Sequence, residues 1–409
     1  MRLGDFIRIP NTKLSVIEPF FIPLIGLLII HTLTTKKITF NTSLTKYFVA
    51  FFLFGLVNLS ASIFFFNNDT AFALGQFRRI CIYPVIYFIG YNYSGGCLGF
   101  KKIHLVYTSS LVVILFMGIF FYYFGINLDH HGYLQFYHHF EGWVVSYFLF
   151  YFIYRLRDTK KWVNSNSIYG LLAVIIIVLT NRRGVWFGSL LLSFGAYFIS
   201  LKKITFTKIS SFTIKLTIFI TLFSFGSYYI ISQSNSDVIN SVQLRIMDTI
   251  TNLENPNDVS DGGSIFWRLN IYSQSVDYIL ENPIFGKGLG FDPIFRMQHL
   301  YSWTLNDDVG FHNAYLHVLV TMGGVGLFLF LFIHLNFIVR VLKNRNKLPI
   351  GTKSIILSLF TVYLIGMLWA NIANTLVSNV NFIFLIFFIM GIVTKEIDYY
   401  SLIEEKFIE

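Results

Sequence analysis

The chain has 409 residues, of which 55% are hydrophobic and 19% aromatic, while only 13% are charged. About a quarter of the residues in a soluble domain are charged, so this composition excludes an ordinary soluble domain. The formal net charge of +10 does not indicate nucleic-acid binding. Lysine and arginine collect in short loops between apolar runs, as the positive-inside rule describes for membrane proteins.

Long apolar runs recur along the whole sequence, most of them close to the ~20 residues that a transmembrane helix needs. We therefore expect an all-α polytopic membrane protein with about 11–12 transmembrane helices. The N-terminal stretch is basic and then apolar, and we interpret it as a retained first helix. The runs lie near residues 16–33, 47–66, 72–93, 103–124, 141–154, 168–179, 185–201, 212–232, 314–341, 355–370 and 376–393.

Basic residues fall in alternate loops, which orients the predicted helices. The loops that contain residues 36–46, 101–102, 155–161, 202–208 and 340–347 should be cytoplasmic. The loops at 67–70, 125–140, 181–184 and 233–311 should then face outward. The N-terminus conflicts with this pattern, because Arg2, Arg8 and Lys13 would lie outside. Either the first residues form an interfacial helix, or the run at 16–33 does not cross fully.

We expect three parts in chain order: transmembrane helices over residues 1–232, an extracytoplasmic loop over 233–311, and further transmembrane helices with a cytoplasmic tail over 312–409. The outer loop is acidic on balance. Asn282 and Pro283 should end a helix within it, because a residue before proline avoids the helical region. An apolar stripe predicts that this helix is amphipathic and packs on the membrane domain. The stripe consists of Ile265, Leu269, Tyr272, Val276 and Ile279.

Arg182 and Arg183 stand between two apolar runs, in the sequence VLTNRRGVWFG. Two guanidinium groups in such a place are costly unless they face water, protein or an anionic group. They form either a positively charged turn or an anion clamp, since the planar guanidinium matches phosphate oxygens. The alternation of loop charge makes this an outward turn, where basic residues are not expected. That placement favours the clamp.

Two further residues of the outer segment are candidates for chemistry. Arg268 lies beside the apolar stripe, where its side chain either runs along the apolar surface or points toward a functional site. His312, in FHNAYLH, stands where the outer segment enters the next span. Histidine suits base catalysis near neutral pH, although a histidine at a membrane boundary is commonly a hydrogen-bonded structural residue.

Two other clusters are less specific. The sequence HHGYLQFYHHFEGW contains His138 and His139 after an earlier histidine pair. Its spacing fits no standard zinc pattern, so we favour a loop in contact with sugar over a metal site. Arg78 and Arg79, in GQFRRICIYP, fall inside an apolar run. They line a water-filled cavity or pair with a lipid headgroup, or else the helix begins later than the run.

Several motifs of other enzyme classes do not occur. The sequence GKGLG at 286–290 lacks the lysine–serine/threonine ending of a phosphate loop and follows a predicted helix, so we interpret it as a turn. The sequence contains no Walker motif, no Ser-His-Asp signature and no acidic pair in the first outer loop. The chemistry indicated is anion binding by arginine with one candidate base, and neither a cofactor nor a metal is implied.

The order of three features resembles a known family. Arg183, Gly184 and Trp186 come first, and a long outer loop with an arginine-bearing helix then leads into NPIFGKGLGF. His312 and Asn313 then open a glycine-rich span. This order resembles the O-antigen ligase and O-antigen polymerase superfamily of bacterial envelope glycosyltransferases. The motifs cover about residues 180–331, and the fold that the resemblance implies is a GT-C-like set of transmembrane helices.

The resemblance implies metal-independent, inverting glycosyl transfer at the bacterial inner membrane, with the active site facing the periplasm or exterior. Arg183 and Arg268 would stabilise the departing pyrophosphate, with Arg182 as the alternative to Arg183. His312 would orient or deprotonate the acceptor hydroxyl. Residues expected to bind substrate are Arg182, Arg79, Arg78, Asn313, His138 and His139.

The implied partners are an undecaprenyl-pyrophosphate-linked glycan donor, a glycan or lipid A core acceptor, the lipid bilayer and a chain-length regulator. Our leading hypothesis is a polymerase that joins lipid-linked repeat units of O-antigen or capsular polysaccharide. The alternative is a ligase that moves the finished glycan to lipid A core, and the shared motifs do not separate the two. A lipid-linked oligosaccharide flippase is a more remote alternative, because internal repeats and midplane charges would be expected for it.

Overall fold

A computed structural model describes the chain over residues 39–93, 104–105, 107–109, 111–116, 139–159, 165–179, 183–200, 210, 264–293, 311, 313–370 and 380–408. Within these residues all regular structure is helical, which confirms the predicted all-α membrane fold. Three of the described helices are long and apolar enough to cross a membrane, namely Thr45–Phe64, Thr70–Asn92 and Ala314–Asn344. Each of them coincides with one of the predicted apolar runs.

The chain forms two compact units. Unit 1 combines Met1–His104 with Ser264–Glu409, and unit 2 is the intervening Leu105–Gly263. The main helices of unit 2 are α6 (His139–Thr159), α7 (Ser165–Leu179) and α8 (Arg183–Ser200), which pack on one another. Tyr147 and Phe148 of α6 are fully buried, and the Phe148 ring packs against Tyr169 of α7. The division by membrane topology at residues 232 and 311 stays a prediction.

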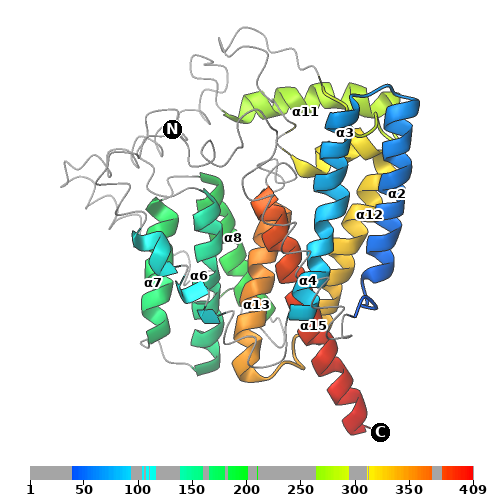
Figure 1. The fold of residues 1–409 in the computed structure, drawn as a ribbon. Coiled ribbons are helices and arrows are strands. Elements are labelled where there is room, and N and C mark those ends of the chain that lie inside the picture. The colour runs from blue at the N-terminus through cyan, green and yellow to red at the C-terminus, as the bar shows by residue number, and fades with distance from the viewer. Residues whose placement is uncertain are drawn as a thin grey trace, which may run out of the picture. The chain divides into compact units, whose positions relative to one another are not determined.

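Unit 1 contains a set of long helices from both ends of the chain (Figure 1). The first are α2 (Thr45–Phe64) and a continuous helical run made of α3 (Thr70–Phe77), the π-helical turn η1 (Arg78–Ile82), the 3₁₀ turn η2 (Tyr83–Val85) and α4 (Ile86–Tyr93). The others are α11 (Ser264–Glu281), α12 (Ala314–Asn344), α13 (Ile350–Leu364), the π-helical turn η4 (Ile365–Ala370) and α15 (Val380–Ile408).

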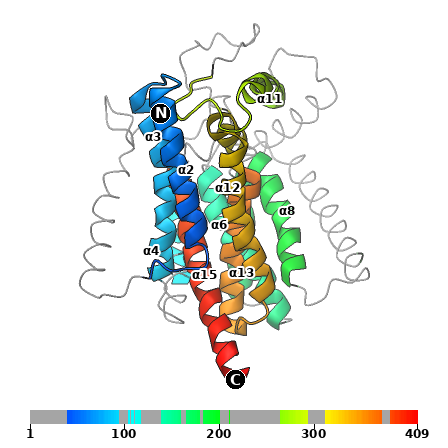
Figure 2. The same ribbon diagram turned by 90° about the vertical axis from the view of Figure 1, so that its right-hand side faces the viewer.

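Helix α11 differs in direction from the other helices of unit 1. It lies crosswise over one end of α12, and Figure 2 shows it almost end-on while α2 and α12 run along the unit. The C-terminus lies at the opposite end of the unit. This placement agrees with a helix that lies on a membrane-spanning bundle, as the amphipathic pattern predicted.

Helices α4 and α15 cross at two glycines, which brings their backbones into contact. A Cβ atom at Gly90 would overlap the Phe388 carbonyl oxygen, and one at Gly391 would overlap the Tyr87 carbonyl oxygen. Small residues allow such close crossings in membranes, where association depends on packing rather than on water exclusion. This crossing joins the first part of the chain to its last helix.

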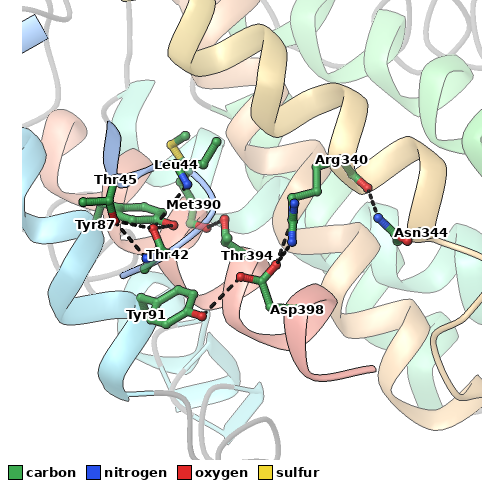
Figure 3. Close-up of polar contacts among 10 residues, drawn as sticks. All are labelled: Thr42, Leu44, Thr45, Tyr87, Tyr91, Arg340, Asn344, Met390, Thr394 and Asp398. Carbon is green, nitrogen blue, oxygen red and sulfur yellow. Dashed lines mark hydrogen bonds and ion pairs between the residues drawn. The ribbon is translucent and has the colours of Figure 1, made fainter. Parts of the chain in front are cut away.

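Polar contacts hold unit 1 together at the end remote from α11 (Figure 3). Asp398 of α15 accepts a hydrogen bond from Arg340 Nε of α12 at 2.7 Å and one from the Tyr91 hydroxyl of α4 at 3.2 Å. Nearby, the Tyr87 hydroxyl donates to Thr42 Oγ1 at 3.0 Å. Three helices therefore share one buried polar cluster.

Candidate functional site

The segment that follows α11, residues 282–291, is docked into a break in α12, and we refer to it as the docked loop. Gly323 has φ 68° and ψ −172°, which interrupts the helix. In an unbroken helix, Gly324 and Val325 would donate to the carbonyls of Val320 and Thr321. Here the two N–H groups and the two carbonyl groups form hydrogen bonds with the docked loop instead. The bonds are Lys287 N to Val320 O (2.8 Å), Gly288 N to Thr321 O (3.0 Å), Gly324 N to Pro283 O (2.8 Å) and Val325 N to Ile284 O (3.3 Å).

Glycine is needed on both sides of this contact. Gly323 and Gly286 have positive φ angles of 68° and 75°, a region that side-chain-bearing residues rarely adopt. A Cβ atom at either residue would lie 2.6 Å from the backbone nitrogen of the other. The GKGLG sequence is therefore a turn, as predicted, and its glycines also allow it to approach the broken helix.

Three side-chain amides, from α2, from the turn that follows it and from α3, hydrogen-bond to the docked loop. Asn58 of α2, which is only 3% exposed, donates to the Phe285 carbonyl at 2.9 Å and accepts from Leu289 N at 3.1 Å. Asn68 donates to the Lys287 and Leu289 carbonyls, both at 3.0 Å. Gln76 of α3 accepts from Gly290 N at 2.9 Å. The turn at 67–70 and the docked loop, both predicted to face outward, thus lie at the same end of unit 1.

The predicted apolar stripe of α11 needs one correction. Tyr272 and Ile279 pack toward the start of α12 as expected, but Val276 is 48% exposed. The buried face is centred on Ile271 and Ser275, which are both fully buried. Ser275 donates its hydroxyl to the Ile271 carbonyl at 2.7 Å, so this small polar side chain is satisfied within its own helix. A pattern that scores only apolar residues misses such a position.

Arg78 and Arg79 occupy the π-helical turn η1 within the span Thr70–Asn92. The helical run begins at Thr70, so the alternative that the helix begins after these arginines is wrong. The Arg78 guanidinium lies 5.9 Å from the centre of the Tyr83 ring. Arg79 Nε is buried and has no hydrogen-bond partner among the residues described. Turns of this kind are frequent at functional sites.

The start of α12 brings a further polar group next to Arg79. Asn313 caps the helix by accepting from Leu316 N at 3.1 Å. His317 follows one turn later, and its ring packs edge-on against Phe311 with 5.3 Å between ring centres. In the part of the chain that the structure describes, His317 Nε2 is buried without a hydrogen-bond partner. Arg79 is close enough for its charge to act on His317.

His317 was not among the residues singled out from the sequence. The signal that could have identified it is the second histidine of FHNAYLH, four residues after Asn313 and therefore on the same side of the helix. A polar residue in the first turns of an apolar helix is common at a membrane boundary. Its significance depends on Arg79, which comes from another element.

The structure places the backbone of some residues that were predicted to be catalytic or to bind substrate. Arg183 is the first residue of α8 in unit 2, and Arg268 lies within α11 of unit 1. His139 begins α6. The side chains of these three fall outside the described residues. His312, Arg182 and His138 lie wholly outside them. Their roles stay predictions.

Among the described residues no group of three or more histidine, cysteine, aspartate or glutamate side chains could hold a metal ion. The histidine-rich sequence before α6 is outside this range, so the preference for a sugar-contacting loop over a metal site stays a prediction.

Comparison with known proteins finds a similarity to one family model. Residues 168–331 match a family model described as O-Antigen ligase. The match confirms the resemblance to the O-antigen ligase and polymerase superfamily, and it contains Arg183, Arg268 and His312. A protein of Haemophilus influenzae (strain ATCC 51907 / DSM 11121 / KW20 / Rd) named "Uncharacterized protein" is 28% identical over 204 residues. These residues are 46% of this chain and 47% of that protein, so the match spans about half its length.

Proposed function

We propose that this helical membrane protein is a glycosyltransferase that moves a glycan from an undecaprenyl pyrophosphate carrier to a hydroxyl acceptor. The observation that carries the proposal is the family match over residues 168–331, which includes the arginine–glycine turn, the arginine of α11 and the histidine before α12. The reaction would take place at the outer face of the bacterial inner membrane, on the side toward which the docked loop is predicted to face.

In the proposed reaction, the acceptor hydroxyl oxygen bonds to the anomeric carbon of the donor sugar. The bond from that carbon to the pyrophosphate oxygen breaks, and the carbon inverts its configuration. His312 takes the hydroxyl proton. The pyrophosphate leaves with the electron pair, and Arg183 and Arg268 offset the negative charge that develops on it. The proposed mechanism uses these side chains and needs no metal ion.

The remaining candidates are proposed to bind substrate. Arg182, Arg78 and Arg79 would bind phosphate oxygens of the donor, because guanidinium groups are costly in a membrane span unless an anion or water meets them. Asn313 would help to position the acceptor beside His312. The histidine-rich loop, with His138 and His139, would contact sugar.

The acceptor distinguishes two forms of this activity. We propose a polymerase, in which the acceptor is another lipid-linked repeat unit and a chain-length regulator limits the product. The second form is a ligase with lipid A core as acceptor, and the description of the matching family favours it. The chemistry at the anomeric carbon is the same in both cases.

The purified full-length protein in lipid nanodiscs can test the proposal. It would be supplied with undecaprenyl-pyrophosphate-linked repeat units, with and without lipid A core. A ladder of longer lipid-linked chains identifies a polymerase, and glycan attached to lipid A core identifies a ligase. If the folded protein gives neither product with the repeat unit of its own host, the proposed function is wrong.

Single substitutions then test the catalytic residues. Arg183→Ala, Arg268→Ala and His312→Ala should each lower kcat/KM for glycan transfer by on the order of 10²-fold or more. Lys287→Ala is the matched control, because Lys287 is a basic residue of the docked loop whose side chain pairs with Glu281. The hydrogen bonds that Lys287 forms with α12 and Asn68 come from its backbone. The transfer rate of Lys287→Ala should therefore stay near that of the wild type. A wild-type rate for Arg268→Ala would remove Arg268 from the mechanism.

A further inference from the structure

Arg79 stands out among the arginines within the described spans of unit 1. Arg340 pairs with Asp398 at 2.5 Å, and Arg78 lies over the Tyr83 ring. The described residues provide no hydrogen-bond partner for Arg79 Nε, although this atom is buried. A charged side chain inside a membrane span is expensive unless it meets water or an opposite charge. The position therefore indicates that an anion binds at Arg79.

His317 supplies a second group at the same place from a different helix. Its Nε2 is also buried without a hydrogen-bond partner in the described part of the chain, and the charge of Arg79 acts on it. The two side chains do not hydrogen-bond to each other through these atoms, since both atoms lack a partner, and a neutral imidazole can present Nε2 as an N–H donor. An oxyanion accepts hydrogen bonds from both groups, whereas a cation or an apolar ligand leaves them unmatched.

We infer that Arg79 of η1 and His317 of α12 together form a subsite for one phosphate group of a membrane lipid. In this subsite His317 binds the phosphate group beside the Arg79 guanidinium. The phosphate belongs to the pyrophosphate of the isoprenoid-linked donor, an identification that rests on the proposed function. Phosphate fits because its oxygens accept the planar donor fork of arginine and an imidazole N–H at the same time.

A binding measurement with the full-length protein tests this subsite. The protein is placed in nanodiscs of zwitterionic phosphatidylcholine and titrated with undecaprenyl pyrophosphate, then in a separate series with phosphatidylglycerol. Arg79→Gln should raise the Kd for undecaprenyl pyrophosphate by on the order of tenfold or more, and His317→Gln by about two- to tenfold. In the double variant the losses should be less than multiplicative, because both side chains hold one ligand.

Two matched controls separate binding from folding. Arg345→Gln removes a basic side chain that donates to the Leu342 carbonyl. His334→Gln removes a histidine of α12 whose Nε2 is likewise buried without a hydrogen-bond partner among the described residues, but whose Nδ1 lies 2.7 Å from the Tyr363 hydroxyl. Both should keep the wild-type Kd in folded protein. Equal Kd values for wild type, Arg79→Gln and His317→Gln would overturn the subsite. Equal affinity for phosphatidylglycerol would overturn its assignment to the isoprenoid donor.

Transfer assays separate failure of the subsite from failure of the proposed function. If the subsite holds the donor, Arg79→Gln should raise KM for the lipid-linked donor more than it lowers kcat, and Arg79→Lys should recover part of the loss. A wild-type KM in Arg79→Gln would contradict the subsite while leaving glycosyl transfer intact. Undecaprenyl pyrophosphate binding that depends on Arg79, in a protein that transfers no glycan, would contradict the proposed function and keep the subsite.

Discussion

A single amide of α2 binds both the docked loop and the broken turn of α12. Asn58 donates to the Phe285 and Thr321 carbonyls at 2.9 and 3.4 Å and accepts from Leu289 N. All three partners come from the docked loop or the broken turn of α12. A backbone group that is left buried without a partner costs about 1–3 kcal/mol, so one side chain can decide whether this loop stays docked.

Asn58→Ala should therefore lower the free energy of unfolding by about 1–3 kcal/mol. It should also speed tryptic cleavage after Lys287 in the docked loop. Thermal unfolding in detergent and timed digestion measure the two effects. Ser60→Ala is the control, because Ser60 is exposed on the same helix and donates only to the Leu56 carbonyl. Cleavage at the wild-type rate in Asn58→Ala would mean that other contacts hold the loop.

The sequence could not predict this role. Asn58 is one polar residue in a predicted apolar run, and its partner Phe285 lies 227 residues away. The same limit applies to Arg79 and His317, whose relation depends on helices from different parts of the chain. Arg183, Arg268 and His312 could be proposed from sequence because each stands in a recognisable local motif, and the family match contains those motifs.

At the scale of the elements, helix positions were predictable and helix irregularities were not. The run at 47–66 corresponds to α2 (Thr45–Phe64), because length and hydropathy largely define a membrane span. The break at Gly323 is different, since its freed backbone groups are satisfied by the docked loop. A glycine pair such as Gly323 and Gly324 is also compatible with an unbroken helix. Tertiary contacts therefore decide where the helix breaks.

The crossing of α4 and α15 gives a prediction at this scale. Gly391→Ala should destabilise the folded protein by about 1–3 kcal/mol, because the new methyl group would overlap the Tyr87 carbonyl oxygen. Gly75→Ala is the matched control, since a Cβ atom there meets no atom within 4 Å and alanine favours a helix over glycine. Thermal unfolding should show a lower Tm only for Gly391→Ala. Equal Tm values would show that the helices separate at little cost.

At the scale of the whole molecule, the two compact units do not follow the order of the chain. Unit 1 is built from both ends, and the family match at 168–331 begins in unit 2 and ends in unit 1. Arg183 belongs to unit 2, whereas Arg268 and His312 belong to unit 1. Neither unit by itself contains all three residues proposed for catalysis.

Asp398 provides the link between the two ends of the chain within unit 1. It lies 307 residues after Tyr91, which donates to it, and it also accepts from Arg340 of α12. The Asp398 side chain is only 12% exposed and that of Arg340 34% exposed. Removing one partner of such a pair leaves the other charge poorly solvated, and this costs more than removing both partners together.

Arg340→Leu and Asp398→Leu should each lower the Tm, and the double variant should lose less stability than the sum of the single losses. We expect a coupling free energy of about 0.5–3 kcal/mol for groups in contact, measured by thermal or denaturant unfolding in detergent. Asp398→Asn separates the contributions, because an amide still accepts from the Tyr91 hydroxyl while the charge is lost. Additive losses in the cycle would mean that these residues stabilise the fold independently, and the ion pair would then not be what joins the last helix to α12.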